Sequence, residues 1–275
     1  MKKGLRWAVS LEETGTSSGF ENTFRRAVLC ASESDVEQQR RFRFKEDALA
    51  CLIGRLMPRR AAVLQMPSSS WSSLEFVRNE KGKPSIRQSA QFEYNIAHHG
   101  DLVVLATGET RIGVDVMRIE EDRRATAAEQ MDTLRRHFSA EETETVKGKE
   151  SETERWRAFF RIWCLKESIL KATGVGLPDG LHNHTFHLND DCVPGNLITS
   201  TEYFHRLISQ PQWRFEESFI GQNHCVAVAS ESFSEAVPFE MITLESILKN
   251  AEFVNVTADV DEELDAFMEK PNKPF

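Results

Sequence analysis

The chain has 275 residues, 40% of them hydrophobic, which is enough for one large or two small domains with sizeable cores. Its formal net charge of −9 argues against a general nucleic-acid-binding protein. The five cysteines are scattered and form no CxxC pair, so neither a zinc site nor a disulfide framework is indicated. The N-terminus lacks an apolar signal core, and no run of about 18 apolar residues occurs. We therefore expect a soluble, cytoplasmic protein that does not associate with membranes.

Residue patterns in the first half predict, in chain order, a strand at 5–10, a polar loop at 13–19, a helix at about 34–64 that Pro58 kinks or divides, and strands at 74–78, 92–96 and 102–107. A turn at 79–84 carries two lysines. Residues 40–87 include eleven basic and four acidic residues, which gives this segment a net charge of +7. Such a basic island suits a small polyanion or an acidic partner. The alternative, a solvated helix face and a basic loop, explains Arg59 and Arg60 better than the later segment RNEKGKP.

A strand expected at 112–117 carries an isolated carboxylate. The two-residue period of a strand places Ile112, Val114 and Val116 on one face. Asp115 then points to the other face, next to Gly113, which leaves room beside it. A lone strand Asp is usually an edge or turn feature, so this signal is weak by itself.

Patterns in the second half predict a charged loop at 120–128, a helix at 131–138, a short helix opened by a capping box at 139–142, a long helix at 152–173, and strands at 185–188, 212–219 and 224–229, the last two joined as a hairpin. We interpret His182, His184 and His187 as loop and strand residues, because their spacing does not fit a helical metal site. Residues 231–275 show little periodicity, and we expect a partly ordered, appended tail there.

The long helix has a buried stripe formed by Trp156, Phe159, Phe160, Trp163 and Leu170. Glu167 lies on this stripe, where a carboxylate must be hydrogen-bonded, paired or bound to a cation. Lys171, one turn further on, could pair with it. The helix alone does not decide between a structural Glu167–Lys171 pair and a functional site.

Three features together favour a functional site. The first is the basic turn with Arg78, Lys81 and Lys83. The second is the strand carboxylate Asp115 with His98 upstream of it, and the third is the Glu167–Lys171 pair on the long helix. Magnesium is usually held by one or two carboxylates plus substrate phosphates. Basic side chains and a histidine around it would hold phosphate oxygens. This combination is what cleavage of a pyrophosphate with phosphoryl-type transfer requires.

At this point the sequence resembles a known family, the 4′-phosphopantetheinyl transferases of the two-lobed, surfactin-synthetase-activating type. The segments GVDV (113–116) and WCLKESILKA (163–172) resemble its two signature motifs, (I/V)G(I/V)D and WxxKESxxKA. Further matches are GRLM (54–57), KGKP (81–84), NIAH (95–98), FSAEE (138–142), GVGL (174–177) and FEES (215–218). They are most like the animal enzymes that act on aminoadipate-semialdehyde dehydrogenase. Each match is weak alone, but their order and spacing are highly specific.

The resemblance implies an enzyme that transfers phosphopantetheine from coenzyme A to a serine of an apo carrier protein and releases 3′,5′-ADP. It implies an α+β fold with two similar lobes, residues 1–110 and 111–230, a C-terminal extension at 231–275, and coenzyme A bound between the lobes. One chain would supply the whole site, so a monomer is expected. The carrier could belong to a fatty acid synthase, an aminoadipate reductase, or a polyketide or peptide synthetase.

The resemblance also implies roles for individual residues. Asp115 and Glu167 would bind Mg²⁺, and Glu167 would also act as base for the carrier serine, directly or through water. Lys171 would neutralise charge as the pyrophosphate bond breaks, and His98 would hold a phosphate oxygen. The remaining coenzyme A contacts would come from Arg78, Lys81, Gly82, Lys83, Pro84, Asn95, Ile96 and Ala97, with Arg78, Lys81 and Lys83 at the 3′-phosphate and adenine.

Two positions depart from the family pattern. Met117 stands where many relatives have a carboxylate, so a water is expected in that coordination place. Ala97 stands where the family normally has Ser or Thr, which removes one hydrogen bond worth about 0.5–1.5 kcal/mol. The sequence therefore predicts several-fold weaker coenzyme A binding, which Ala97→Ser would reverse.

Two alternatives remain. One is a catalytically idle module that binds coenzyme A or a carrier protein, with Ala97 as a mark of decay. The other is a structural protein with coincidental ion pairs, which would leave the basic turn and the order of the motifs unexplained. Magnesium-dependent release of 3′,5′-ADP would separate the enzyme from both.

Overall fold

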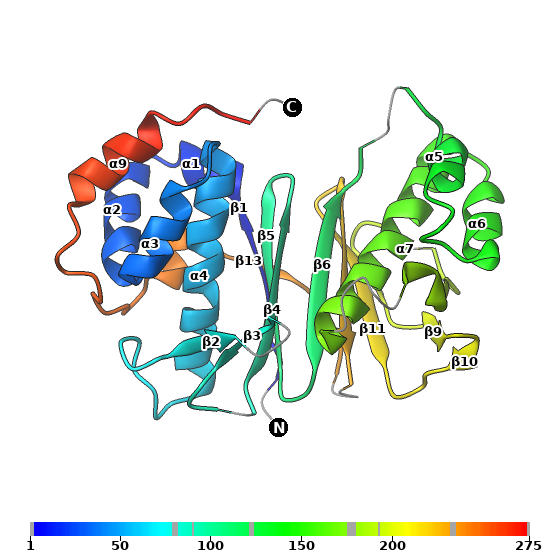
Figure 1. The fold of residues 1–275 in the computed structure, drawn as a ribbon, viewed down its shortest axis with the longest axis horizontal. Helices are drawn as coiled ribbons and strands as arrows, with labels where there is room; N and C mark the ends of the chain where they lie inside the picture. Colours follow the sequence, from blue (N-terminus) through cyan, green and yellow to red (C-terminus); the bar gives the residue numbers. More distant parts are fainter. Residues whose placement is uncertain are drawn as a thin grey trace.

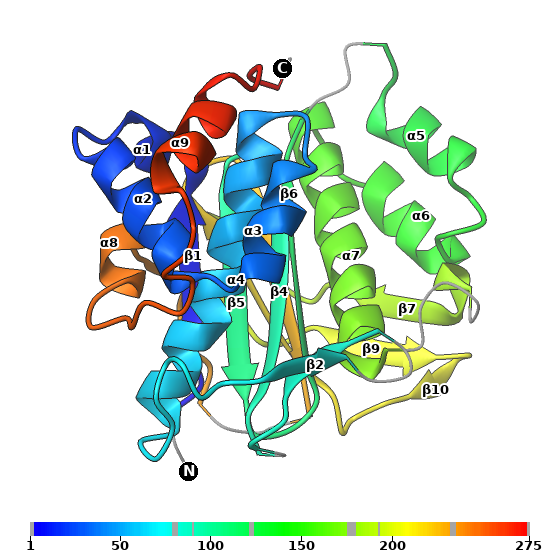
Figure 2. The same cartoon turned by 60° about the vertical axis from the view of Figure 1, so that its left-hand side comes forward.

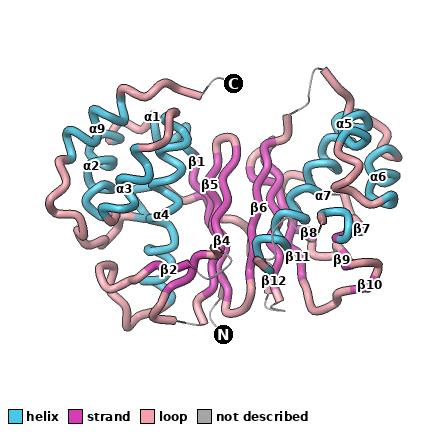
Figure 3. The backbone as a smooth tube through the Cα atoms, viewed as in Figure 1, coloured by secondary structure: helices cyan, strands magenta, loops and turns pink. Residues whose placement is uncertain are grey.

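Two β-sheets lie face to face at the centre of the molecule, and helices cover the outer face of each (Figure 1). The computed structural model describes residues 3–78, 82–89, 91–120, 124–174, 180–191, 193–231 and 235–273. Figure 3 shows strands in the middle and most helices on the two sides. The expected α+β class is thus confirmed.

The first sheet has the order β13-β1-β5-β4, with strands β13 (Glu240–Met241), β1 (Arg6–Ser10), β5 (Leu102–Gly108) and β4 (Glu93–His99). Its outer side is covered by α1 (Leu11–Thr16), α2 (Phe20–Cys30), α3 (Glu33–Arg40), α4 (Lys45–Gln65), α8 (Leu244–Ile247) and α9 (Val260–Met268). A two-stranded ribbon of β2 (Phe76–Arg78) and β3 (Pro84–Ile86) lies at one end of this half.

The second sheet has the order β6-β12-β11-β8, with strands β6 (Ile112–Arg118), β12 (His224–Ser230), β11 (Arg214–Ile220) and β8 (Leu197–Ile198). The long helix α7 (Glu152–Thr173) packs on it, and α5 (Ala127–Thr133) and α6 (Ala140–Lys147) pack on α7. A small sheet of β7 (His184–His187), β9 (Glu202–His205) and β10 (Ile208–Ser209) follows the 3-10 turn η2 (Leu181–Asn183).

Small and branched apolar residues fill the space between the two sheets: Ala8, Ala97, Leu102, Val104 and Ala106 from the first, and Ile112, Val114, Val116, Val226 and Val228 from the second.

Two side chains of β4 bridge to backbone N–H groups of β6. Asn95 Oδ1 accepts from Val114 at 2.9 Å, and His99 Nδ1 accepts from Arg118 at 2.9 Å. The strands β4 and β6 therefore run in the same direction, in a fixed register.

The C-terminal extension is part of the first half rather than a partly ordered tail, so that expectation is wrong. Its β13 pairs in parallel with β1, and its helices bury Leu244, Ile247 and Leu264 in the core of the first half. The ring of Phe267 lies 4.7 Å from that of Phe24 and 5.5 Å from that of Phe20. These aromatic contacts make α9 a structural element of this core.

Other expectations for the first half are also corrected. The segment expected as a polar loop at 13–19 contains most of α1, and α2 was not predicted from the sequence. Pro58 does not divide its helix, because α4 continues through it; the break lies at 41–44 instead. In the second half, the bounds of α7, the Ser139 capping box and the β11–β12 hairpin are confirmed.

The three histidines near residue 184 lie in η2 and β7, as interpreted. The Nδ1 of His184 lies 2.7 Å from the hydroxyl of Tyr203, and His187 Nε2 lies 2.8 Å from a Glu141 oxygen. Within the described part of the chain, no helix combines the length and apolar character of a membrane span.

Candidate functional site

The site begins at the contact between β6 and α7. Because Val114 and Val116 face the inter-sheet core, the side chain of Asp115 lies on the opposite face of the strand, as predicted, and there it points toward α7. Gly113 allows the helix to approach this closely: a Cβ at this position would overlap the carbonyl of Ser168 and the backbone of Ala172. In the strand motif, Gly113 thus lets the helix approach closely, and Asp115 places its carboxylate against the helix.

Asp115 is a buried carboxylate with one oxygen paired and one open. It is 7% exposed, and its Oδ1 accepts a hydrogen bond from Lys171 Nζ at 2.7 Å. Its Oδ2 is buried and has no hydrogen-bond partner among the described residues. Burial raises the pKa of Asp115, and Lys171 opposes this shift. An open carboxylate oxygen of this kind is an available ligand for a cation.

Glu167 lies on the same side of α7 and is half-buried. Burial raises its pKa first, the negative charge of Asp115 raises it further, and Lys171 lowers it. The two carboxylates are therefore close enough to repel each other. Lys171 makes its ion pair with Asp115, so the structural Glu167–Lys171 pair considered from sequence is not the arrangement found.

The two carboxylates fit a magnesium ion better than a metal that needs a complete protein ligand set. The described residues contain no group of three or more His, Cys, Asp or Glu side chains placed for a metal. Magnesium commonly takes only one or two carboxylates and fills its octahedron with water and phosphate oxygens. Met117, where many relatives have a carboxylate, packs against the apolar cluster beneath α7 and adds no ligand.

The edge strand β4 brings four of the predicted residues alongside this contact. Asn95 and Ala97 face the second sheet, whereas Ile96 and His98 point the other way, toward α4. His98 keeps an exposed edge, but desolvation by the surrounding protein lowers its pKa, as does the positive charge of Lys171, while Asp47 opposes them. His98 is therefore near Lys171, but Ala97 is in the inter-sheet core.

The basic turn reaches the C-terminal end of α7. Arg78 donates a hydrogen bond to the carbonyl of Gly82 at 2.7 Å, and Gly82 has a φ of +81°, which favours glycine. Lys83 pairs with Glu93 at 2.8 Å and donates to the carbonyl of Ala172 at 3.3 Å. Figure 2 shows β2 beside this end of α7. Pro84 opens β3, and Lys81 lies outside the described residues.

Most other charges of the basic island have structural partners. Arg59 is buried, donates to the carbonyls of Trp71 and Leu74, and packs on the rings of Trp71 and Phe76. Arg40 pairs with Glu263, and Arg87 pairs with Glu75. The island is therefore not one continuous surface for a polyanion.

The sequence missed one charged pair near the site. Lys273, from the C-terminal extension, pairs with Asp47 at 3.0 Å, and its backbone N–H donates to Glu46 at 2.8 Å. Both Asp47 and Lys273 influence the pKa of His98. The lysines near the end of the chain could have indicated this pair. They were not considered, because the extension was expected to be only partly ordered.

Comparison with known proteins gives the class to which this geometry belongs. A model of the 4′-phosphopantetheinyl transferase superfamily matches residues 111–229, and a model of the N-terminal region of 4′-phosphopantetheinyl transferases matches residues 18–110. The chain belongs to the 4′-phosphopantetheinyl transferase superfamily.

Within this family the chain is similar to animal enzymes. It is 34% identical over 236 residues to the L-aminoadipate-semialdehyde dehydrogenase-phosphopantetheinyl transferases of Homo sapiens and Pongo abelii, which covers 82% of this chain and 74% of each relative. It is also 31% identical over 175 residues to the 4′-phosphopantetheinyl transferase of Bacillus subtilis, which covers 64% of this chain and 73% of that protein.

Proposed function

We propose that this chain transfers the 4′-phosphopantetheine group of coenzyme A to a serine hydroxyl of an apo carrier protein and releases 3′,5′-ADP. The observation that carries the proposal is the open Oδ2 of Asp115, buried beside Glu167 and Lys171 on the two motifs of the family. A purely structural ion pair would have no reason to leave this oxygen without a partner.

Asp115 and Glu167 would hold a magnesium ion. When bound, the ion would offset their mutual repulsion and stabilise negative charge on the pyrophosphate of coenzyme A. Lys171 already lies at Asp115, with 31% of its side chain exposed, and can turn an N–H toward a phosphate oxygen as charge develops.

Glu167 would act as the base for the carrier serine, directly or through a water. The raised pKa of its carboxyl makes it a better proton acceptor than an exposed glutamate. His98, whose pKa is lowered, would be neutral at pH 7 and donate an N–H to a phosphate oxygen.

The nucleotide half of coenzyme A would bind between the basic turn and β4. Arg78, Lys81 and Lys83 would contact the 3′-phosphate and adenine side, with Gly82 and Pro84 shaping the turn. Asn95, Ile96 and Ala97 would contribute backbone groups, because an edge strand leaves alternate N–H and C=O groups without a strand partner.

The carrier, oligomeric state and location belong to the same proposal. The animal relatives carry aminoadipate-semialdehyde dehydrogenase in their names, so a carrier domain of aminoadipate reductase type is one candidate. A fatty acid synthase or a polyketide or peptide synthetase is the other. We propose a cytoplasmic monomer, because the halves 1–110 and 111–230 together supply all the proposed site residues. The described part of the extension, residues 235–273, completes the core of the first half.

The experiment is Mg²⁺-dependent release of 3′,5′-ADP from coenzyme A in the presence of an apo carrier protein, with mass spectrometry of the carrier serine. Glu167→Gln should reduce turnover by about 10²–10⁴-fold, the usual contribution of a general base, without unfolding the protein. Retained turnover would remove Glu167 as base. Binding of coenzyme A without transfer, in the wild type with Mg²⁺ and carrier, would identify the chain as an idle binding module.

A further inference from the structure

A buried ion pair joins the two halves of the molecule outside the site described above. Arg6 of β1 donates to both carboxylate oxygens of Glu216 of β11, from Nε to Oε2 at 2.9 Å and from Nη2 to Oε1 at 3.3 Å. Each residue is only 5% exposed. A buried ion pair often gives no more stability than apolar residues of similar volume, and its best-attested use is to fix one arrangement of packed elements. The geometry around the pair shows which arrangement it could fix.

The strand registers place this pair in one row that runs across both sheets. The row consists of three mutually opposite residues in each sheet: Arg6, Ala106 and Asn95 in the first, and Glu216, Val228 and Val114 in the second. At one end of the row the Arg6–Glu216 pair connects β1 to β11, and at the other end the Asn95–Val114 hydrogen bond connects β4 to β6. Neighbouring strands are about 4.8 Å apart, so these two connections are separated by about 10 Å.

The contact between β4 and β6 is fixed at a second point further along the same strands, where His99 Nδ1 accepts from the N–H of Arg118. Two fixed points on one line still allow the sheets to rotate about that line. The apolar side chains between the sheets are mostly Ala and Val, and their attraction is not directional. The Arg6–Glu216 pair lies off the β4–β6 line, so it supplies a third point, which fixes the angle between the sheets.

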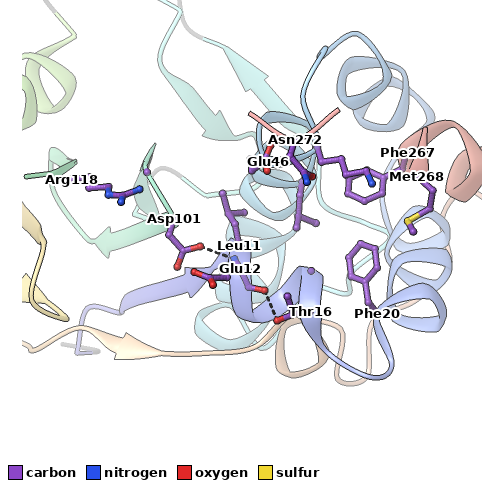
Figure 4. A pocket seen from close by; sticks show the side chains of 14 residues that line it. Leu11, Glu12, Thr16, Phe20, Glu46, Asp101, Arg118, Phe267, Met268 and Asn272 are labelled. Atoms are coloured by element: carbon purple, nitrogen blue, oxygen red, sulfur yellow. Dashed lines mark hydrogen bonds between the residues drawn. The ribbon is translucent and has the colours of Figure 1, made fainter. Parts of the chain in front are cut away.

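The far end of the strands gives the halves less support. A pocket of about 500 Å³ opens there, and Arg118 of the second half lines it together with Asp101 and other residues of the first half (Figure 4). Beside it, the backbone N–H of Asp101 donates to His224 Nε2 at a long distance of 3.4 Å. A hollow interface restrains two packed parts less than a filled one. The angle between the halves therefore depends on contacts at the other end of the strands, where the Arg6–Glu216 pair lies.

The angle between the sheets sets the opening of the proposed site. His98 comes from the first half, whereas Asp115 and Lys171 come from the second. His98 and Asp115 lie on the faces of β4 and β6 that point away from the inter-sheet core, toward α4 and α7. A rotation about the β4–β6 line that separated β1 from β11 would therefore bring the α4 side and the α7 side together, and the reverse rotation would move them apart.

We propose that Arg6 and Glu216 are positioning residues for the binding of coenzyme A, a role that rests on the proposed function. Their ion pair fixes the angle between the sheets and, with it, the separation of the site residues that belong to different halves. Both side chains are buried between the sheets, so neither contacts the ligand. Loss of the pair should weaken binding of a ligand that contacts both halves. It should not weaken binding of Mg²⁺, because both proposed metal ligands belong to the second half.

Replacing both charges with apolar side chains separates positioning from stability. Arg6→Met/Glu216→Leu removes the pair without leaving a buried charge uncompensated, a change that often leaves stability intact. The matched control is Arg161→Met/Glu217→Leu. Arg161 and Glu217 form a similarly buried pair, with Nε to Oε2 also at 2.9 Å, but this pair joins α7 to β11 within the second half. Arg6→Lys is a milder variant, because it keeps the charge and loses the two-pronged hydrogen bonding.

Rates of 3′,5′-ADP release should give a KM for coenzyme A about 5–10-fold higher in Arg6→Met/Glu216→Leu and about 2–3-fold higher in Arg6→Lys, because the ligand groups on the two halves are no longer pre-aligned. The kcat should change by less than about threefold, since bound ligand restores the angle. The control should keep its KM within about twofold of the wild type, and Mg²⁺ should raise Tm equally in all four proteins.

An unchanged KM in Arg6→Met/Glu216→Leu, or an equal rise in the control, would overturn the positioning role. Loss of the Mg²⁺ effect on Tm in the Arg6 variants alone would also overturn it, since the damage would then extend beyond the angle between the halves. If Arg6→Met/Glu216→Leu does not fold, an unchanged KM in Arg6→Lys has the same consequence. A wild-type protein that releases no 3′,5′-ADP would refute the proposed function, and this role with it.

Discussion

Lys166 and Lys171 belong to one turn-and-a-half of α7, yet their surroundings are opposite. Lys166 is 1% exposed, pairs with Glu142 at 2.8 Å, and donates to the carbonyls of Leu181 and His184. Lys171 is 31% exposed and pairs with Asp115, whose second oxygen is open. In the first region the lysine and both oxygens of its carboxylate partner have hydrogen-bond partners, whereas in the second one carboxylate oxygen has none.

The contrast separates structural from functional charge. Glu142 also accepts from the N–H groups of Ser139 and Phe186, so its pair with Lys166 ties α6 and β7 to α7. Burial lowers the pKa of Lys166 and raises that of Glu142, and each partner opposes the shift of the other. Removing either one would leave a buried charge without compensation.

The largest expected effect comes from exchanging each lysine for methionine. Lys166→Met should lower the free energy of unfolding by about 3–5 kcal/mol, because Glu142 loses its buried partner. Lys171→Met should lower turnover by about 10²–10³-fold, the usual cost of removing one transition-state donor, with a smaller loss of stability. Urea denaturation and initial rates of 3′,5′-ADP release measure the two quantities.

The same two variants control each other, since both remove a lysine from one helix. If Lys171→Met proved the more destabilising, or Lys166→Met abolished turnover in the folded fraction, the separation of structural and functional charge on α7 would be wrong.

A second, smaller effect concerns stability and pH in the metal-free protein. The pKa of Glu167 is higher in the folded protein than in the unfolded chain. Its charge therefore lowers the stability at pH values above the folded-state pKa. This loss of stability disappears as the pH falls through the folded-state pKa to the pKa of the unfolded chain. Glu167→Gln should therefore raise Tm by at least 2 °C at pH 8, roughly 0.5–1 kcal/mol for a protein of this size, and by less at pH 5.

Magnesium provides the complementary measurement. Ion binding to the folded state raises Tm in the wild type by mass action, whereas Glu167→Gln should show a reduced shift because it has lost a ligand. A variant that was less stable than the wild type at pH 8 without metal would contradict the repulsion between Glu167 and Asp115.

The sequence predicted the second half better than the first, for physical reasons. The α7 stripe of Trp156, Phe159 and Leu170 gives a strong local signal, and the predicted bounds of the helix agree with the structure. The extension gives weak local signals. Its strand β13 has two residues and pairs with β1, and its helix α8 has four residues and packs against α4, so both depend on partners far away in sequence. Tertiary packing, not local propensity, decides such short elements.

The candidate site shows the same division. Residue types and order pointed to Asp115, Glu167 and Lys171, but not to which carboxylate the lysine contacts, because that depends on how closely Gly113 lets α7 approach. A pocket lies where the extension meets the first half, and Phe267 and Asn272 are among the residues that line it. This pocket could not be predicted while the extension was expected to be partly ordered. A site formed by segments distant in sequence is visible only after the fold is known.

The smallest expected effect concerns β4, where Ala97 lies in the apolar core between the sheets and its neighbour His98 is exposed. Ala97 is 5% exposed and faces the apolar cluster between the sheets, on the opposite side of the strand from His98. We therefore expect Ala97→Ser to cost about 1 kcal/mol of stability, for a hydroxyl placed in apolar surroundings, and to leave the KM for coenzyme A unchanged. The sequence alone predicted a several-fold lower KM. Rate measurements over a range of coenzyme A concentrations, with Tm in parallel, decide between the two. A lower KM would show that the hydroxyl reaches a phosphate oxygen from this face of β4, and that the inter-sheet core at position 97 is open to the ligand.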